Sequence, residues 1–299
     1  MAEPQPNMQL RTLVGSAQRA IAESTRRPAF ELPYTAPDLR PNPAVEVFDK
    51  VRAGLFALSG VLLLATSLAF GAGMDARTQA SLLDTGLVHA VIWPVIGIAL
   101  IASAAFSALP AQLSSRRQRA AGIHALSAAA LMSCALTLAS GFLPWTAAAV
   151  SAAAAGIALY GVHQLNLNTA RNRTERIATD MPLGFFAGFA LVYTLQLVSA
   201  AAGWNEPGHA LAVSLVAVAA AVPAAVFAHS ERGRHAFASG FGLALAAAAA
   251  QGWMLGATPL WACVLWVFLA IVVFVCAENR RFQISHAEHR VQAGRTLDF

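Results

Sequence analysis

Charged residues are scarce in this 299-residue sequence: Asp, Glu, Lys and Arg together make up 12% of it. A soluble globular domain carries about 25% charged residues, so this chain lacks the side chains needed to cover an ordinary wetted surface. Hydrophobic residues make up 57% of the sequence and the mean hydropathy is +0.57. Lipid must therefore be the solvent for most of the chain, which predicts an integral membrane protein.

Cysteine is also scarce, and the usual catalytic motifs are missing. Cys134, Cys263 and Cys276 lie within apolar runs and have no CxxC spacing, which is typical of small buried hydrophobic residues. The sequence contains no HExxH, no GxSxG, no phosphate-binding loop and no dinucleotide-binding glycine pattern. Ion-coupled carriers usually keep a charged residue in mid-span, and no Asp, Glu, Lys or Arg lies in the middle of any apolar segment here. These absences argue against an enzyme and against proton-coupled transport.

Eight apolar segments reach or approach the length of about twenty residues that crosses a bilayer core. The first begins only after about fifty polar, proline-dotted residues, which is too late for a cleavable leader. The segments are 52–73, 86–109, 120–142, 145–166, 182–203, 210–229, 236–254 and 258–277. We therefore expect an all-α, polytopic transmembrane helix bundle with eight spans.

The basic residues lie on one side of these spans. With the N-terminus in the cytoplasm, all 20 lysines and arginines except Arg77 fall in or beside the inner segments, whereas the outer loops hold Asp75, Asp84 and Glu206. The positive-inside rule then places both termini in the cytoplasm. We expect the spans to lie in a bacterial plasma (inner) membrane. The basic residues behind the net charge of +5 orient the spans and contact anionic lipid headgroups. The expected partner is the lipid bilayer, not nucleic acid.

Two polar tails flank the spans. Residues 1–49 form a predicted cytoplasmic tail that includes a proline-rich linker from Pro28 to Pro43. Apolar residues at positions 10, 13, 14, 17 and 21 follow helical spacing, which fits an amphipathic helix on the inner leaflet or a chance pattern in a disordered tail. Residues 278–299 form a predicted cytoplasmic C-terminal tail that frays.

The first and fifth spans resemble one another. "GLFALSGVLLLATSLAFGAG" from Gly54 aligns without gaps with "GFFAGFALVYTLQLVSAAAG" from Gly184, and the next span in each case contains an interior proline, Pro94 or Pro223. This pattern fits either a parallel four-plus-four repeat or a chance likeness between alanine-rich helices. In transporters, corresponding broken helices mark the binding site.

A few polar and aromatic residues lie within the spans. His89, Trp93 and Pro94 fall near the outer end of the second span, and Tyr193 and Gln196 fall in the fifth. Such groups either hydrogen-bond between helices or line a ligand cavity.

Two further histidines lie near the inner ends of the third and fourth spans. His124 and His163 are at similar depth, so they are candidate haem-iron ligands if the imidazoles face each other. Otherwise each rests at the membrane interface. No other metal site is predicted.

The order of these features resembles the tryptophan-rich sensory protein (TspO/MBR) family, in its longer bacterial form with extra C-terminal helices. The second span contains "HAVIWPVIGIAL" and closes on "ALPAQ" before a basic loop, and the fifth opens with "MPLGFFAGFALVYTLQLVSAAAGW". The resemblance covers about residues 52–204. It implies a five-helix core over 50–204, three further helices over 205–277, and an aromatic-walled pocket for porphyrins, haem breakdown intermediates or sterol-like ligands.

The resemblance also implies site residues. Trp93 matches the family tryptophan of the second helix, and Pro182 and Phe186 match the opening of the fifth. Phe189 stands where the family has another tryptophan. Together with the span residues described above, these matches give the predicted ligand-binding residues: His89, Trp93, Pro94, Pro182, Phe186, Phe189, Tyr193 and Gln196, with a porphyrin or haem as the possible ligand.

Three functions remain open. The first is a sensory or binding membrane protein for a hydrophobic or tetrapyrrole-like ligand. The second is a non-catalytic accessory subunit of a larger membrane complex; the expected assembly is either such a complex or a homo-oligomer. The third is a transporter of a neutral or lipophilic solute.

Overall fold

The computed structural model describes residues 40–70, 81–141, 143–231 and 234–292, with side chains up to residue 289. Every element in these ranges is helical, which confirms the all-α prediction. The long helices are α2 (Val47–Phe70), α3 (Leu87–Ser107), α4 (Arg116–Ser140), α5 (Pro144–Leu167), α7 (Met181–Ala201), α8 (Ala210–Ala228), α9 (His235–Met254) and α10 (Leu260–Gln292). The predicted amphipathic segment at residues 10–21 and Arg77 lie outside the described residues.

Three short elements precede two of the long helices. The single turn α6 (Arg173–Glu175) and the π-helical turn η2 (Arg176–Asp180) run directly into α7, and the 3-10 turn η3 (Pro207–His209) leads into α8. Pro144 lies in the first turn of α5, where a missing backbone donor costs no helical hydrogen bond. Pro182 comes directly after the π-helical turn η2, so it lies within a helical segment that already began at Arg173. The starts of α5 and α7 are close to the predicted ones.

Seven of the eight long helices are long and apolar enough to cross a membrane, so the chain is a multi-pass membrane protein by helix length and hydropathy. The eighth, α9, is less apolar because it begins at His235 and contains several glycines and, near its end, Gln251. It lies between α7 and α10. A helix enclosed by other helices on two sides needs small residues for close approach more than it needs large apolar ones.

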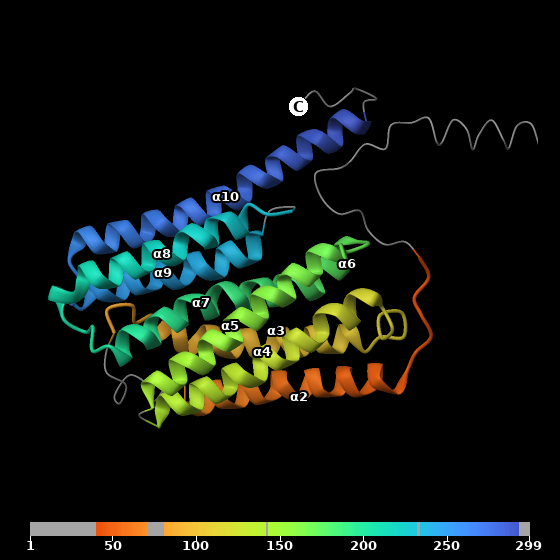
Figure 1. The fold of residues 1–299 in the computed structure, drawn as a ribbon, viewed down its shortest axis with the longest axis horizontal. Helices are drawn as coiled ribbons and strands as arrows, with labels where there is room; N and C mark the ends of the chain where they lie inside the picture. Colours follow the sequence, from red (N-terminus) through yellow and green to blue (C-terminus); the bar gives the residue numbers. More distant parts are fainter. Residues whose placement is uncertain (1–39, 71–80, 142, 232–233, 293–299) are drawn as a thin grey trace, which may run out of the picture.

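Helix α7 lies between two groups of helices (Figure 1). Helices α2, α3, α4 and α5 are on one side, and α8, α9 and α10 are on the other. Helix α2 packs along α3 and α4, and α4 along α5; on the other side α7 packs along α9, and α9 along α10. The arrangement α2–α4–α5 therefore recurs as α7–α9–α10.

The second helix of each proposed repeat breaks this correspondence. Helix α3 lies on α2 and also contacts α7, whereas α8 packs on α10. Both helices continue through their interior prolines, Pro94 and Pro223. The two prolines consequently occupy different places in the bundle.

The last helix is longer than predicted. Helix α10 continues past residue 277 to Gln292, so residues 278–292 are helical and not frayed. Side chains one turn apart support the extension: Arg281 lies 4.0 Å from Glu278, and Arg280 donates to Gln283 over 3.3 Å.

The two ends of the bundle differ in composition. The arginine-rich end holds the start of α2, the α3–α4 and α5–α7 connections, the α8–α9 connection and the second half of α10 (Figure 1). At the opposite end, which we call the tryptophan-rich end, the described residues include no lysine or arginine. Its tryptophans are Trp145, Trp204, Trp253 and Trp261.

Candidate functional site between α3 and α7

An aromatic cluster joins α3 to α7. Trp93 of α3 is fully buried, and three aromatic rings of α7 contact it nearly at right angles. The ring centroids of Phe186, Phe189 and Tyr193 lie 6.0, 5.2 and 5.3 Å from that of Trp93. Edge-to-face contacts of this kind stabilise a packed aromatic core. The structure thus brings together three residues predicted from the resemblance, Trp93, Phe186 and Phe189, with Tyr193, which was predicted as a polar group of the fifth span.

His89 extends this cluster toward the tryptophan-rich end. Its ring lies 5.1 Å from that of Tyr193, and Trp93 Nε1, one turn away on α3, donates to His89 Nδ1 over 3.2 Å. Since indole N–H can only donate, His89 Nδ1 must be the accepting, unprotonated nitrogen. The neutral imidazole therefore carries its proton on Nε2, and this N–H is buried without a hydrogen-bond partner.

Further buried polar atoms without hydrogen-bond partners lie on α7 and just before the start of α3. Tyr193, Gln196 and Ser199 follow one another at intervals of three residues on α7, and Thr85 precedes His89 by one turn. The partnerless atoms are Thr85 Oγ1, His89 Nε2, Tyr193 Oη, Gln196 Oε1 and Ser199 Oγ. Each of the five side chains belongs to a residue that is at most 8% exposed. We call these five residues the α3–α7 polar cluster.

Hydrogen bonds and close packing around Asp84 and Gly86 hold the Gln196 side of this cluster in place. Gln196 Nε2 donates to Asp84 Oδ1 over 3.2 Å, and the same carboxylate oxygen accepts the Gly86 amide at 3.0 Å. Gln251 of α9 packs against Gly86, where an added β-carbon would lie 2.6 Å from its carboxamide. Gly86 has φ +53°, a conformation that suits glycine. Three helices therefore meet at the start of α3.

Two predicted site residues lie apart from the partnerless atoms. Pro94 is half-buried next to Trp93 and has no polar atom to offer a ligand. Pro182 lies in the first turn of α7 at the arginine-rich end, about three helical turns from Tyr193.

The aromatic cluster as arranged does not fit a tetrapyrrole. Trp93 is 0% exposed, so no face of its indole is open to a stacking macrocycle. His89 is equally unsuited to ligate iron, because Nε2 carries the proton while Nδ1 accepts the Trp93 N–H. A tetrapyrrole would have to displace at least one of the rings packed around Trp93.

The predicted histidine pair is arranged differently from a haem-ligand pair. The rings of His124 and His163 both contact Tyr160, at 4.9 and 6.2 Å between centroids. His124 Nδ1 donates to Ala120 O over 2.8 Å, and His163 is exposed. These contacts favour the alternative in which each histidine rests at the membrane interface. Among the described residues, no group of three or more His, Cys, Asp or Glu side chains is placed to hold a metal ion.

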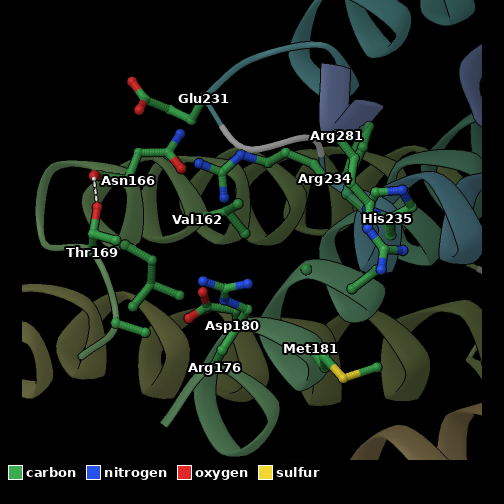
Figure 2. A pocket seen from close by; sticks show the side chains of 15 residues that line it. Val162, Asn166, Thr169, Arg176, Asp180, Met181, Glu231, Arg234, His235 and Arg281 are labelled. Carbon is green, nitrogen blue, oxygen red and sulfur yellow. Dashed lines mark hydrogen bonds between the residues drawn. The ribbon is translucent and has the colours of Figure 1, made fainter. Parts of the chain in front are cut away.

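A cavity that was not predicted opens at the arginine-rich end (Figure 2). It has a volume of about 370 Å³ and lies between the end of α5, the second half of α10 and the starts of α7 and α9. Its charged lining comes from Arg176, Asp180, Glu231, Arg234 and Arg281. The sequence indicated only that these arginines set topology, because the packing of four helix ends around one space has no local pattern. Neither Pro94 nor Pro223 lines this cavity.

Comparisons of this chain with protein-family models, with curated proteins and with solved structures found no match. The likeness to the TspO/MBR family therefore stays a prediction based on the residues quoted above.

Proposed function

We propose that this chain is a multi-pass binding protein of a bacterial plasma membrane, with eight spans and both termini in the cytoplasm. Seven helices qualify as spans by length and hydropathy, and α9 connects two of them. The arginine-rich end matches an inner face by the positive-inside rule. Trp145, Trp253 and Trp261 at the other end are at least half exposed, as expected for an aromatic belt at the outer interface.

The binding site is the α3–α7 polar cluster. One observation supports it above all: five buried polar atoms on facing elements have no hydrogen-bond partner. Leaving one such atom unsatisfied costs about 1–3 kcal/mol, so several in one place favour a ligand that supplies the missing bonds.

The chemistry of these atoms narrows the ligand. His89 Nε2–H donates, Gln196 Oε1 accepts, and the three hydroxyl groups can do either. The nearby Asp84 carboxylate is already hydrogen-bonded to Gln196 and to the Gly86 amide. The ligand is therefore a small uncharged molecule with both donor and acceptor groups, rather than the tetrapyrrole that the family likeness implies.

The test is native mass spectrometry of the full-length protein purified from membranes in a mild detergent, followed by identification of any molecule released on unfolding. We compare wild type with Tyr193→Phe, which removes a hydroxyl group that has no protein partner. One lost hydrogen bond of about 1.4 kcal/mol corresponds to a tenfold drop in affinity. In Tyr193→Phe the fraction of protein that carries the bound molecule should be lower than in wild type. The melting temperature of the ligand-free variant should equal that of ligand-free wild type.

Tyr160→Phe is the matched control, because Tyr160 is 52% exposed on α5. This variant should retain the bound molecule at the wild-type level. If wild-type protein releases no small molecule under these conditions, the five atoms bind only water and the proposal fails.

A further inference from the structure

The cavity at the arginine-rich end is bounded by elements from both sides of the bundle. Val162 and Asn166 of α5 face it from one side, and Arg234 and His235 at the start of α9 face it from the other (Figure 2). Arg176 in η2 and Arg281 of α10 complete the charged lining. Its volume of about 370 Å³ is enough for a polar headgroup or a small anion with its water.

Arginines outnumber carboxylates around this space. Asp180 is paired with the buried Arg117 and accepts from Thr179 over 3.1 Å. Glu278 lies 3.0 Å from His235 Nε2 and 4.0 Å from Arg281. Among the residues that line the cavity, Arg176, Arg234 and Arg281 against Asp180 and Glu231 leave one positive charge with His235 neutral.

Arg234 has a buried guanidinium nitrogen with no hydrogen-bond partner in the protein. This nitrogen is Nη2, whereas Nε lies 3.4 Å from Ser230 Oγ, and the guanidinium lies 5.5 Å from the centre of the Phe227 ring. Figure 2 shows this side chain reaching into the cavity toward Asn166. Burial lowers the pKa of Arg234 to about 9, against the opposing effect of the Glu231 carboxylate. The group is therefore still a cation at neutral pH.

The start of α9 adds to this field. Arg234 is the N-cap residue of α9, and its side chain does not cap the helix. The first amide groups of a helix are free donors, and the helix dipole places partial positive charge there. Arg234 and these amide groups thus favour an anion in the same place.

We propose that this cavity binds a phosphate group. Arg234 Nη2 donates to a phosphate oxygen, and Arg176 supplies a second positive charge from the opposite side. Two sources share this chemistry: the headgroup of an anionic phospholipid and a free phosphate ion. Basic pockets between membrane helices at the inner surface are suited to lipid headgroups, and a polar cavity is equally open to a soluble ion.

The experiment measures the thermal unfolding of the full-length protein with two probes. The first is inorganic phosphate added to protein in an uncharged detergent. The second is phosphatidylglycerol at increasing fractions in phosphatidylcholine nanodiscs. We expect a rise of several degrees in the melting temperature with at least one probe. In Arg234→Gln and in Arg176→Gln the concentration needed for half of the rise should increase at least tenfold.

Arg173→Gln is the matched control: Arg173 is exposed in α6, three residues before Arg176, and does not line the cavity. It should respond like wild type. A response to phosphatidylglycerol alone assigns a lipid headgroup, and a response to inorganic phosphate assigns the free ion. If neither probe shifts the melting temperature, or if Arg173→Gln weakens the response as much as Arg234→Gln, the cavity is only solvated and the proposal is overturned.

Discussion

Gly188 of α7 and Gly240 of α9 lie where the backbones of the two helices touch. A β-carbon on Gly188 would overlap the carbonyl oxygen of Phe237, and a β-carbon on Gly240 would overlap that of Phe185. Each glycine therefore makes room for the backbone of the other helix. Since α9 packs along α10 while α7 packs along α5, this contact joins the two sides of the bundle.

Replacing either glycine should loosen the bundle. Gly188→Ala or Gly240→Ala forces the backbones apart, which we expect to cost about 1–3 kcal/mol, as for other overpacked cores. The measurement is thermal unfolding of purified protein in detergent. Gly156→Ala on α5 is the control, because no atom lies within 4 Å of its added methyl group. Its stability should hold or rise slightly, since alanine favours helix. Equal losses in all three variants would refute the close-contact explanation.

The hydrogen bond from Trp93 to His89 gives a second prediction. Trp93→Phe removes the donor, so His89 Nδ1 loses the bond that makes it the accepting nitrogen. We expect the histidine proton to redistribute from Nε2 toward Nδ1. The ¹⁵N chemical shifts of histidine-labelled protein report this change directly. The smaller ring should also leave a void, with a loss of stability of about 1–3 kcal/mol.

Trp266→Phe is the control that separates the change in the His89 proton from the loss of stability caused by a smaller ring. Trp266 is also fully buried, and its Nε1 donates to Ser214 over 3.1 Å, far along the chain from His89. This variant should lose stability to a similar extent while the His89 resonances stay at their wild-type positions. If the His89 shifts are already those of the Nδ1-protonated form in wild-type protein, the assigned tautomer is wrong.

Much of the helical framework was predictable from the sequence, because lipid imposes a simple rule on length and hydropathy. The predicted segment 145–166, for example, became Pro144–Leu167, since a proline and a polar run mark its ends. The end of α10 was missed for a physical reason: hydropathy stops at residue 277, whereas helix propensity in the following Glu, Arg and Gln residues does not.

Contacts between helices were harder to predict. Gly188 and Gly240 look like any other small residues in an alanine-rich span, and only the crossing of α7 and α9 gives them a role. Trp93 and Phe186 were each matched to a position of the family likeness, but their contact was not predicted. The partnerless state of Tyr193 and Ser199 depends on every neighbour of each atom, so no sequence pattern could show it.

Arg117 provides a prediction about the arginine-rich end. This residue is 4% exposed; it pairs with Asp180, lies 4.0 Å from Glu175 and donates to Asn168 O over 2.6 Å. Arg117→Met leaves the two carboxylates without this partner. Breaking a buried pair costs about 3–5 kcal/mol, and we expect the lower end because Asp180 is 27% exposed.

Two further variants make that prediction specific. Arg116→Met removes a neighbouring arginine whose bond to Pro41 O is exposed, so it should cost less than about 1 kcal/mol. Adding Asp180→Asn to Arg117→Met should restore part of the lost stability, because one uncompensated charge is removed. Chemical denaturation of wild type, Arg116→Met, Arg117→Met and the double variant Arg117→Met/Asp180→Asn measures the free energy of unfolding of each. Similar losses in Arg116→Met and Arg117→Met would show that the buried pair contributes little.

The proposed orientation can be tested with two single cysteines in a chain whose three native cysteines are replaced. Asn205 lies in the exposed turn between α7 and α8 at the tryptophan-rich end, and Ser285 lies on an exposed face of α10 at the arginine-rich end. With both termini inside, a membrane-impermeant maleimide should label Asn205→Cys in intact cells and label Ser285→Cys only after permeabilisation. Both sites face water on opposite sides of the bundle, so the pattern must invert if the bundle is inserted the other way. Labelling of both cysteines in intact cells would mean that an even number of segments crosses between them, so that one of the helices α8, α9 and α10 does not span the membrane.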